Sequence, residues 1–391
     1  MGPGKAEATL VDERNLLVAS SDQRLGFDFF GAVVDELPTD VSGKTLYLTG
    51  DVARLRGRLE GAARVFAVEG LASNYDTAPS VHLGRVPVRM GNVGVYYRRF
   101  FDDADFFRRI TSEHTFQSLT ESSKPSKAHR TGIYLTPVSQ QGDELRFHLL
   151  RCSTNLSGPT ENFCATDRLI VNALNEEADV IFRGAAPLNH ALAQRYPSTT
   201  VGLKQTKARI SAHADKTKDM PVDGIMAFCT FYDGLGALTP LPEDAFDYGY
   251  KRRSGLTRLH FRLKDPARQQ AGLPLELSLT LYPGSVFFMP LSTNRLYTHE
   301  IQASVLDAHM LPTRLGYVVR CSKTQAVHAQ GSTFIELDGQ RVRLEPPTPS
   351  GVDALRELYA AENRSDALID YGDRFRFSMN EGDYRAPDPK A

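Results

Sequence analysis

A series of short strand-like segments, beginning near residue 200, most constrains the fold of this 391-residue chain. The segments are rich in β-branched and aromatic residues, and Gly, Pro and Asp separate them. They cover residues 201–211, 225–232, 256–263, 275–281, 285–289, 314–320 and 333–337. A series of this kind predicts a sandwich or barrel of sheets in the second half of the chain.

The segment before these strands is predicted to contain a hairpin and two helices. Residues 132–138 and 145–152 are β-rich, and residues 140–143 supply turn residues between them. Apolar residues at helical spacing predict one helix that begins at Thr166 or Asp167 and another that runs from Pro187 to about Tyr196. Helices followed by strands indicate an α+β arrangement.

The two ends of the chain contain fewer residue patterns that predict secondary structure. Towards the N-terminus we expect a strand at 45–49 and amphipathic helices at 52–65 and 101–110. Near the C-terminus the turn-rich segment EPPTPSG precedes an amphipathic helix at 352–363. The predicted division is an N-terminal α/β extension (1–130), a core (131–345) with an insert near 234–256, and a C-terminal helix and tail (346–391).

Composition excludes several classes of protein. Hydrophobic residues make up 41% and charged residues 24%, as in ordinary globular proteins. The formal net charge of −1 gives no global field to attract nucleic acid. No apolar run is long enough for a signal peptide or a membrane span, and the four cysteines form no CxxC pair. We therefore expect a soluble, intracellular protein with free thiols and no membrane partner.

A candidate metal site lies in the segment KARISAHADKTKDM. His213 and Asp215 are two residues apart, so on a strand their side chains point to the same side. Non-haem iron oxygenases hold Fe(II) with two histidines and one carboxylate and leave the opposite face open for a co-substrate and dioxygen. A second histidine is available in LTLYPGSVFFMPLSTNRLYTHEI, where an apolar strand and Arg295-Leu296-Tyr297 precede His299.

These motifs resemble the AlkB-like and TET-like branch of the Fe(II)/2-oxoglutarate-dependent dioxygenases, which are nucleobase oxygenases. That branch has an HxD, an apolar strand, an Arg-Leu approach to the distal histidine, and then RxxxxxR. Arg314 and Arg320 have this last spacing, six residues apart and on one side of a strand. The resemblance covers residues 203–321. Lys204, Gln205 and Thr206 stand where the family commonly has an Asn and a Tyr that contact the co-substrate.

The resemblance implies a double-stranded β-helix, or jelly-roll, core with flanking helices. It implies Fe(II) bound by His213, Asp215 and His299, with 2-oxoglutarate and dioxygen as co-substrates and ascorbate as a reductant or alternative co-substrate. Arg314 would bind the far carboxylate of 2-oxoglutarate, and Arg320 would lie near the iron-bound one. Arginine suits this role because its planar guanidinium binds carboxylates through two parallel hydrogen bonds.

Two substrate classes follow, and the sequence leaves both open. One is a methylated nucleobase in DNA or RNA, such as 5-methylcytosine or an N-methylated base, flipped into the site. The other is a small molecule or amino acid, which the near-neutral charge suits. Near the mouth of the site we expect substrate contacts from Lys216, Asp219, Asn294, Arg295 and Tyr297.

Other motifs are weaker. The aromatic-basic run from Tyr96 to Phe101 has the composition for stacking on a base, but a core strand or helix explains it better. His309 and His328 lack ligand spacing, and no HExxH, P-loop or nucleophile elbow occurs. A zinc hydrolase is therefore the weaker alternative for the metal site, and the nucleotide-binding and serine hydrolase classes are excluded.

Overall fold

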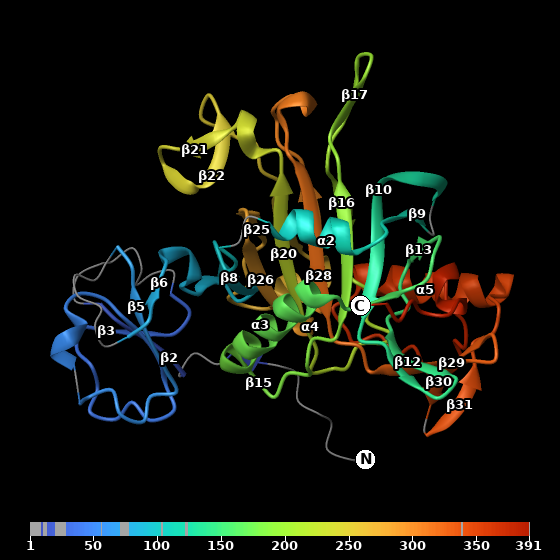
Figure 1. Ribbon diagram of the computed structural model, residues 1–391, viewed down its shortest axis with the longest axis horizontal. Helices are drawn as coiled ribbons and strands as arrows, with labels where there is room; N and C mark the ends of the chain where they lie inside the picture. Colours follow the sequence, from blue (N-terminus) through green and yellow to red (C-terminus); the bar gives the residue numbers. More distant parts are fainter. Residues whose placement is uncertain are drawn as a thin grey trace.

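The computed structural model describes residues 9–10, 14–19, 29–55, 57–70, 78–102, 105–121, 124–337 and 339–390. Its centre is a ten-stranded sheet in which antiparallel pairs predominate (Figure 1). The order is β13 (Thr154–Leu156), β9 (Gln117–Glu121), β10 (Lys124–Thr136), β16 (His190–Tyr196), β28 (Thr313–Arg320), β20 (Ile225–Asp233), β26 (Ser285–Pro290), β8 (Gly94–Tyr97) and β7 (Val88–Met90), with β14 (Glu161–Asn162) beside β10. Segments from both halves of the chain therefore share one sheet.

A four-stranded antiparallel sheet packs on one face of the large sheet. Its order is β19 (Ile210–His213), β27 (Tyr297–Gln302), β24 (Arg258–Leu263) and β25 (Glu276–Thr280). The two sheets share one buried cluster, in which Phe228 of β20 and Phe287 of β26 lie with Phe261 of β24 and Ile301 of β27. This cluster fills the space between the sheets and fixes where β19 and β27 lie against β28.

Helices cover the other face of the large sheet. Helix α2 (Phe106–Glu113) and helix α3 (Ala165–Ile181) lie over it in Figure 1. Ala227, Cys229 and Phe231 of β20 belong to the core under these helices, whereas Met226 and Phe228 belong to the core between the sheets. This alternation follows from the two-residue period of a strand, and it explains why β20 is apolar almost throughout.

The N-terminal part forms a lobe of its own, at the left of Figure 1. Five strands pair in parallel in the order β3 (Ala32–Val34), β2 (Asn15–Val18), β4 (Thr45–Leu48), β5 (Arg64–Val68) and β6 (Ser80–Val81). Separate apolar clusters line the two faces of this sheet. Because β7 and β8 already belong to the large sheet, and residue 130 lies inside β10, we propose a boundary between lobe and core near residue 85.

Three smaller elements complete the fold. Strands β11 (Ser139–Gln141), β12 (Glu144–Leu149), β29 (Thr324–Ala329), β30 (Ser332–Leu337) and β31 (Gln340–Arg343) form an antiparallel sheet. The 234–256 insert contains its own sheet of β21 (Thr239–Leu241), β22 (Asp244–Tyr250) and β23 (Arg253–Ser254). Helix α5 (Pro349–Arg364) begins with Thr348, whose Oγ1 accepts a hydrogen bond from Gly351 N, and it packs near the end of β19.

Most predicted elements are confirmed, with three corrections in the core. The single strand predicted at 201–211 is wrong, because these residues belong to a hairpin of β17 (Thr199–Val201) and β18 (Lys204–Thr206) and to β19 (Ile210–His213). The helix predicted at 187–196 is wrong: His190–Tyr196 is strand β16, paired with β10 and β28 along its length. Helix-favouring residues such as Ala191 and Leu192 enter a strand because both neighbours supply ladder hydrogen bonds. The predicted hairpin has its turn in the right place, but β12 pairs with β11 and β29, and β10 pairs with β16 and β9.

The N-terminal helix predictions are also corrected. Residues 52–65 contain a short 3-10 helix (Val52–Leu55) and the start of β5 instead of one amphipathic helix. The helix expected at 101–110 begins later, as α2 at Phe106. The aromatic run is confirmed as core, since Tyr96, Tyr97, Phe100 and Phe101 are all buried.

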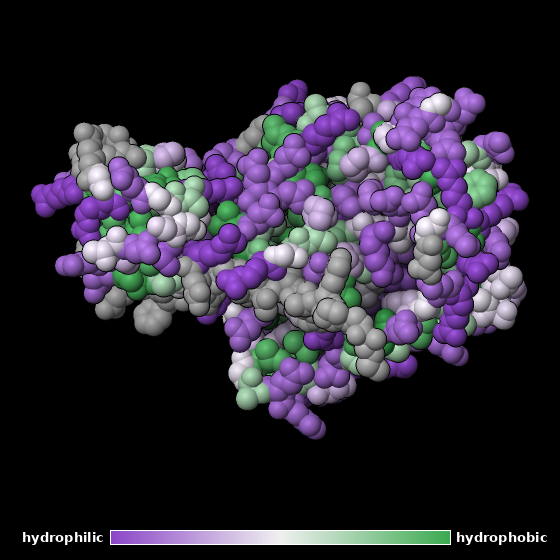
Figure 2. Space-filling view, turned by 90° about the horizontal axis from the view of Figure 1, so that it is seen from below, coloured by the Kyte–Doolittle hydropathy of each residue, from purple (hydrophilic) through white to green (hydrophobic). Residues whose placement is uncertain are grey.

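The surface agrees with the composition. The face shown in Figure 2 is mainly hydrophilic, with small separate apolar patches. Within the described residues, none of the helices has the length and apolar character needed to cross a membrane. All four cysteines are free thiols, as the sequence predicted.

Replacing Phe288 tests the role of the large sheet. The Phe288 ring is fully buried and contacts Tyr97, Phe100 and Phe182 at centroid distances of 5.9 to 6.4 Å. Phe288→Ala should lower the free energy of unfolding by about 3–5 kcal/mol, because it removes a buried ring and leaves a cavity. Leu203→Ala, at a fully exposed site, should change it by less than about 0.5 kcal/mol in the same denaturant titration. Equal effects of the two changes would contradict this packing.

Candidate metal centre

The structure brings His213, Asp215 and His299 together. His213 ends β19, Asp215 follows in the next loop, and His299 lies directly across from His213 on β27. One ligand atom from each of the three residues lies within 4.8 Å of the other two, and the imidazole centroids are 4.5 Å apart. Cross-strand pairing therefore supplies the two imidazoles, and the chain reversal after β19 supplies the carboxylate.

Arg320 holds the Asp215 carboxylate. Its Nη2 and Nε donate to Asp215 Oδ2 over 2.9 and 3.2 Å. Asn294 fixes the backbone of the same residue, since its Oδ1 accepts from Asp215 N and its Nδ2 donates to Asp215 O. Burial would raise the pKa of Asp215, but the Arg320 guanidinium and the nearby imidazoles hold that pKa well below its usual range. The carboxylate is therefore ionised, as a metal ligand must be.

The surroundings of His213 and His299 keep both imidazoles neutral. Ser211 O lies 2.9 Å from His213 Nδ1 and can only accept, so this nitrogen carries the hydrogen and Nε2 is left free, 3.7 Å from Asp215 Oδ1. His299 is buried against Phe228 and Phe261 and its Nδ1 has no hydrogen-bond partner. Burial lowers the pKa of His213, and burial together with the neighbouring His213 lowers the pKa of His299 to about 3. Neutral imidazole is the form that binds a metal.

A cavity of about 100 Å³ adjoins the three ligands. Four residues of β28 line one wall, at alternate positions: Arg314, Gly316, Val318 and Arg320. The sequence prediction that both arginines face one side of a strand is thus confirmed. The intervening residues Leu315, Tyr317 and Val319 belong to the core beneath the helices.

Arg314 has unused hydrogen-bonding capacity at this cavity. The residue is 3% exposed, and its Nε and Nη1 have no partner. Its guanidinium lies 5.2 Å from the centroid of the Tyr196 ring. A Cβ added to Gly316 would lie 2.9 Å from Arg314 Nη2, so glycine leaves the space that the guanidinium occupies. A buried arginine without an anion is costly, and a carboxylate is the partner that a guanidinium binds most strongly.

The residues present therefore fit Fe(II) and a dicarboxylate. Two imidazoles and one carboxylate match the donor set of a non-haem iron centre. The unpaired Arg314 guanidinium matches one end of a bound dianion, in the same cavity as the ligands. The chemistry expected of such a centre is the activation of dioxygen next to a bound co-substrate.

Hydrogen bonds from helix α5 hold the loop that carries Asp215. Asn363 Oδ1 accepts from Ala214 N over 2.9 Å and from Lys216 Nζ over 2.8 Å. Glu362 Oε1 accepts from Thr217 N over 3.1 Å and also from Thr217 Oγ1. These contacts come from nearly 150 residues further along the chain. The C-terminal helix is therefore part of the support of the metal centre.

The five predicted substrate contacts have other partners in the structure. Lys216 lines the cavity, but its Nζ donates to Ala214 O, Tyr359 O and Asn363 Oδ1. Asp219 is buried in a two-bond ion pair with Arg151, and Tyr297 OH donates to Pro274 O. Asn294 binds the Asp215 backbone, and Arg295 lines a separate cavity of about 320 Å³. Apart from Lys216, none of the five lines the metal cavity, whereas Asp219, Asn294 and Arg295 line the larger one, and a substrate role for the five stays a prediction.

Sequence reasoning missed the residues on β16. Tyr196 and Gln194 line the cavity beside Arg314, and Tyr196 OH donates to Gln194 Oε1 over 2.7 Å. They were missed because this segment was predicted to be a helix. The resemblance predicts that an Asn or Tyr near 204–206 contacts the co-substrate, whereas strand pairing brings Tyr196 opposite Arg314. Alternation of His190, Leu192, Gln194 and Tyr196 is the signal that would have found it.

Comparisons with known proteins found structural similarity only. No family model matches the chain, and no curated protein matches it. Similar solved structures include the non-heme alpha ketoglutarate dependent epimerase SnoN from nogalamycin biosynthesis, at 12% identity over 60% of this chain and 80% of that one, with a TM-score of 0.34. OsALKBH1 has 14% identity over 59% and 97%, with a TM-score of 0.33. The Fe(II)/(alpha)ketoglutarate-dependent dioxygenase TqaL has 8% identity over 63% and 79%, with a TM-score of 0.25.

Asn363→Ala tests whether helix α5 supports the metal centre. The change removes the acceptor of Ala214 N and Lys216 Nζ, and loss of an outer partner of a metal site typically weakens affinity about 10–100-fold. Anaerobic Fe(II) titration calorimetry should show a weakening of this size. Glu357→Ala, at an exposed position of the same helix, is the control and should leave affinity unchanged. Unchanged affinity in Asn363→Ala would show that the loop holds its shape without the helix.

Proposed function

We propose that the protein is an Fe(II)/2-oxoglutarate-dependent oxygenase that oxidises a C–H bond of a methylated nucleobase. The carrying observation is the unpaired, buried Arg314 guanidinium in the same cavity as His213, Asp215 and His299. A metal site alone fits many reactions, but a metal site with a buried unpaired arginine fits a dianionic co-substrate. We also propose that the two facing sheets form a double-stranded β-helix, with the lobe before residue 85 as a separate extension.

Each residue has a distinct task in this proposal. His213, Asp215 and His299 would hold the iron through two imidazoles and one carboxylate. Arg314 binds the far carboxylate of 2-oxoglutarate, and Tyr196 packs beneath its guanidinium. Arg320 keeps Asp215 ionised and oriented, and lies next to the site of the iron-bound carboxylate. Bound iron and 2-oxoglutarate, with dioxygen, would supply the oxidising chemistry.

The size of the cavity favours a substrate of which only the oxidised group enters the cavity. About 100 Å³ leaves little room beyond a small dianion, so the oxidised group must reach in through the mouth. A base flipped out of a nucleic acid strand approaches in this way. The backbone of such a substrate would remain on the protein surface.

A projecting hairpin favours nucleic acid over a metabolite. Strands β17 (Thr199–Val201) and β18 (Lys204–Thr206) extend beyond the large sheet, at the top of Figure 1. The tip presents Val201 and Leu203, 77% and 104% exposed, and Lys204 is exposed beside them. Proteins that distort nucleic acid insert apolar side chains between bases while cations bind the phosphates. The hairpin has both features.

Replacing Arg314 tests the co-substrate. Arg314→Gln removes the charge but keeps a donor, and hydrogen bonds to charged groups contribute about 1.5–3 kcal/mol, so KM for 2-oxoglutarate should rise about 10- to 150-fold. The measurement is succinate release against 2-oxoglutarate concentration, with Fe(II) affinity as the control that should stay constant. An unchanged KM would contradict the assignment. Turnover without succinate would point to another reductant, such as ascorbate.

Changes at the iron ligands test the reaction itself. His213→Ala and Asp215→Ala should each abolish succinate release above background, because the metal loses one of its three protein ligands. The assay compares methylated DNA and RNA oligonucleotides with amino acids as stimulants of succinate release. Stimulation by amino acids alone would replace the nucleobase proposal with a small-molecule hydroxylase. Full turnover in either variant would refute the iron centre.

The hairpin is tested by a double change at its tip. Val201→Ser/Leu203→Ser should weaken binding of a methylated oligonucleotide by about tenfold or more, because it removes two apolar side chains whose burial between bases would contribute roughly 1.5–3 kcal/mol each. Succinate release in the absence of substrate should stay the same. Val305→Ser, at another exposed valine with 72% exposure, is the matched control for fluorescence anisotropy. Equal binding by all three proteins would remove the hairpin from the proposal.

A further inference from the structure

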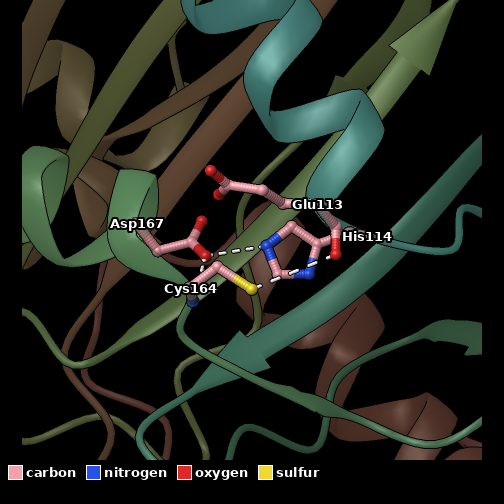
Figure 3. A group of neighbouring side chains, drawn as sticks. All are labelled: Glu113, His114, Cys164 and Asp167. Carbon is pink, nitrogen blue, oxygen red and sulfur yellow. Dashed lines mark hydrogen bonds and ion pairs between the residues drawn. The ribbon is translucent and has the colours of Figure 1, made fainter. Parts of the chain in front are cut away.

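A second cluster of metal-binding side chains lies on the helical side of the large sheet. Glu113 ends α2, His114 follows it, Cys164 caps the start of α3, and Asp167 lies in the first turn of α3. One ligand atom from each of these four residues lies within 4.8 Å of all the others, and Figure 3 shows the four side chains converging. The cluster contacts β28 through Tyr317, whose OH donates to Asp167 Oδ1, on the face opposite the iron cavity.

The donor types are those of a zinc site. One thiol, one imidazole and two carboxylates supply four ligands, and zinc in structural sites is tetrahedral with sulfur, nitrogen and oxygen donors. Zinc–ligand bonds of about 2.0–2.3 Å place ligand atoms roughly 3.3–3.8 Å apart. The cluster reaches this spacing with side-chain movements of about 1 Å. The iron centre differs from it, since the His213, Asp215 and His299 set contains no sulfur.

An unpartnered carboxylate oxygen in the cluster also favours a cation. His114 bonds Asp167 Oδ2 over 2.7 Å and Glu161 Oε2 over 2.8 Å, so one imidazolium lies between two carboxylates. Glu113 adds a third carboxylate: its Oε1 accepts from Thr166 Oγ1, but its Oε2 is buried and has no partner. A buried carboxylate oxygen without a partner is costly, and coordination to a divalent cation would satisfy it. The partnerless oxygen belongs to one of the four converging residues.

We propose that Glu113, His114, Cys164 and Asp167 form a second metal site that binds Zn²⁺ and joins the end of α2 to the start of α3. The zinc replaces the proton between His114 and Asp167 and the proton of the Cys164 thiol. Binding therefore releases two protons, His114 becomes a neutral ligand, and Cys164 becomes a thiolate. Glu161 keeps its hydrogen bond to His114 Nδ1 and orients the ring, as carboxylates commonly do behind zinc-bound histidines.

Cobalt titration of the chelator-treated full chain tests this site. Co²⁺ adopts zinc geometries, and a thiolate ligand gives a sulfur-to-cobalt absorption in the near ultraviolet that the iron centre cannot produce. We expect two equivalents of Co²⁺ and this absorption in the unmodified protein. Cys164→Ser should bind one equivalent without the absorption. Cys152→Ser, which changes the thiol that lines the iron cavity, should retain both features.

Alkylation gives a measurement that needs no variant. Zn²⁺ should protect Cys164 from iodoacetamide in the unmodified protein, and a chelator should restore its labelling, as peptide mass spectrometry reports. In calorimetry, Cys164→Ser should weaken the second Zn²⁺ site by more than about 100-fold, beyond the loss expected of an outer partner. A single equivalent without sulfur absorption in the unmodified protein, or labelling of Cys164 that is independent of Zn²⁺, would overturn the proposal.

Discussion

The buried ion pair between Asp215 and Arg320 is the interaction on which the metal centre depends. A carboxylate in a pocket lined by Phe228 and two imidazoles would become protonated without a cation beside it. Arg320 prevents this and fixes which oxygen faces it, since Oδ2 takes both hydrogen bonds. The remaining oxygen, Oδ1, lies on the side of His213. One arginine thus sets both the charge and the direction of the only anionic ligand.

Strand β28 connects this pair to the rest of the molecule. Its cavity side carries the two arginines, and its other side carries Tyr317, which bonds Asp167 beneath helix α3. The strand lies between β16 and β20, so its position is determined by ladders on both edges. The His213, Asp215 and His299 cluster and the proposed zinc site therefore share one strand and lie on its opposite faces.

Support for the metal loop comes from parts of the chain that are far apart in sequence. Asn294 precedes β27 and binds the Asp215 backbone, whereas Asn363 and Glu362 reach the same loop from helix α5. Lys264 joins these elements, because its Nζ donates to Asn294 O and to Glu362 O. A loop between two strands is ordinarily free to move, and these bonds hold it in one conformation.

The sequence by itself determined the local elements whose periodicity is strong, and the pattern of ligands. Strands such as β20 and β28 and helices α3 and α5 were predictable because each has a clear apolar repeat. The HxD spacing, and the six-residue spacing of the arginines, were visible because a strand has a fixed period of two.

Only the tertiary structure determined which strands pair and which side chains contact one another. His190–Tyr196 became a strand because β10 and β28 flank it, and this pairing brought Tyr196 to Arg314. Lys216 and Asp219 form buried hydrogen bonds and ion pairs because folding brings their partners, Asn363 and Arg151, next to them. The pairing of Tyr196 with Arg314 and the ion pair of Asp219 with Arg151 have no local signal, since strand pairing and buried ion pairs join residues that are distant in sequence.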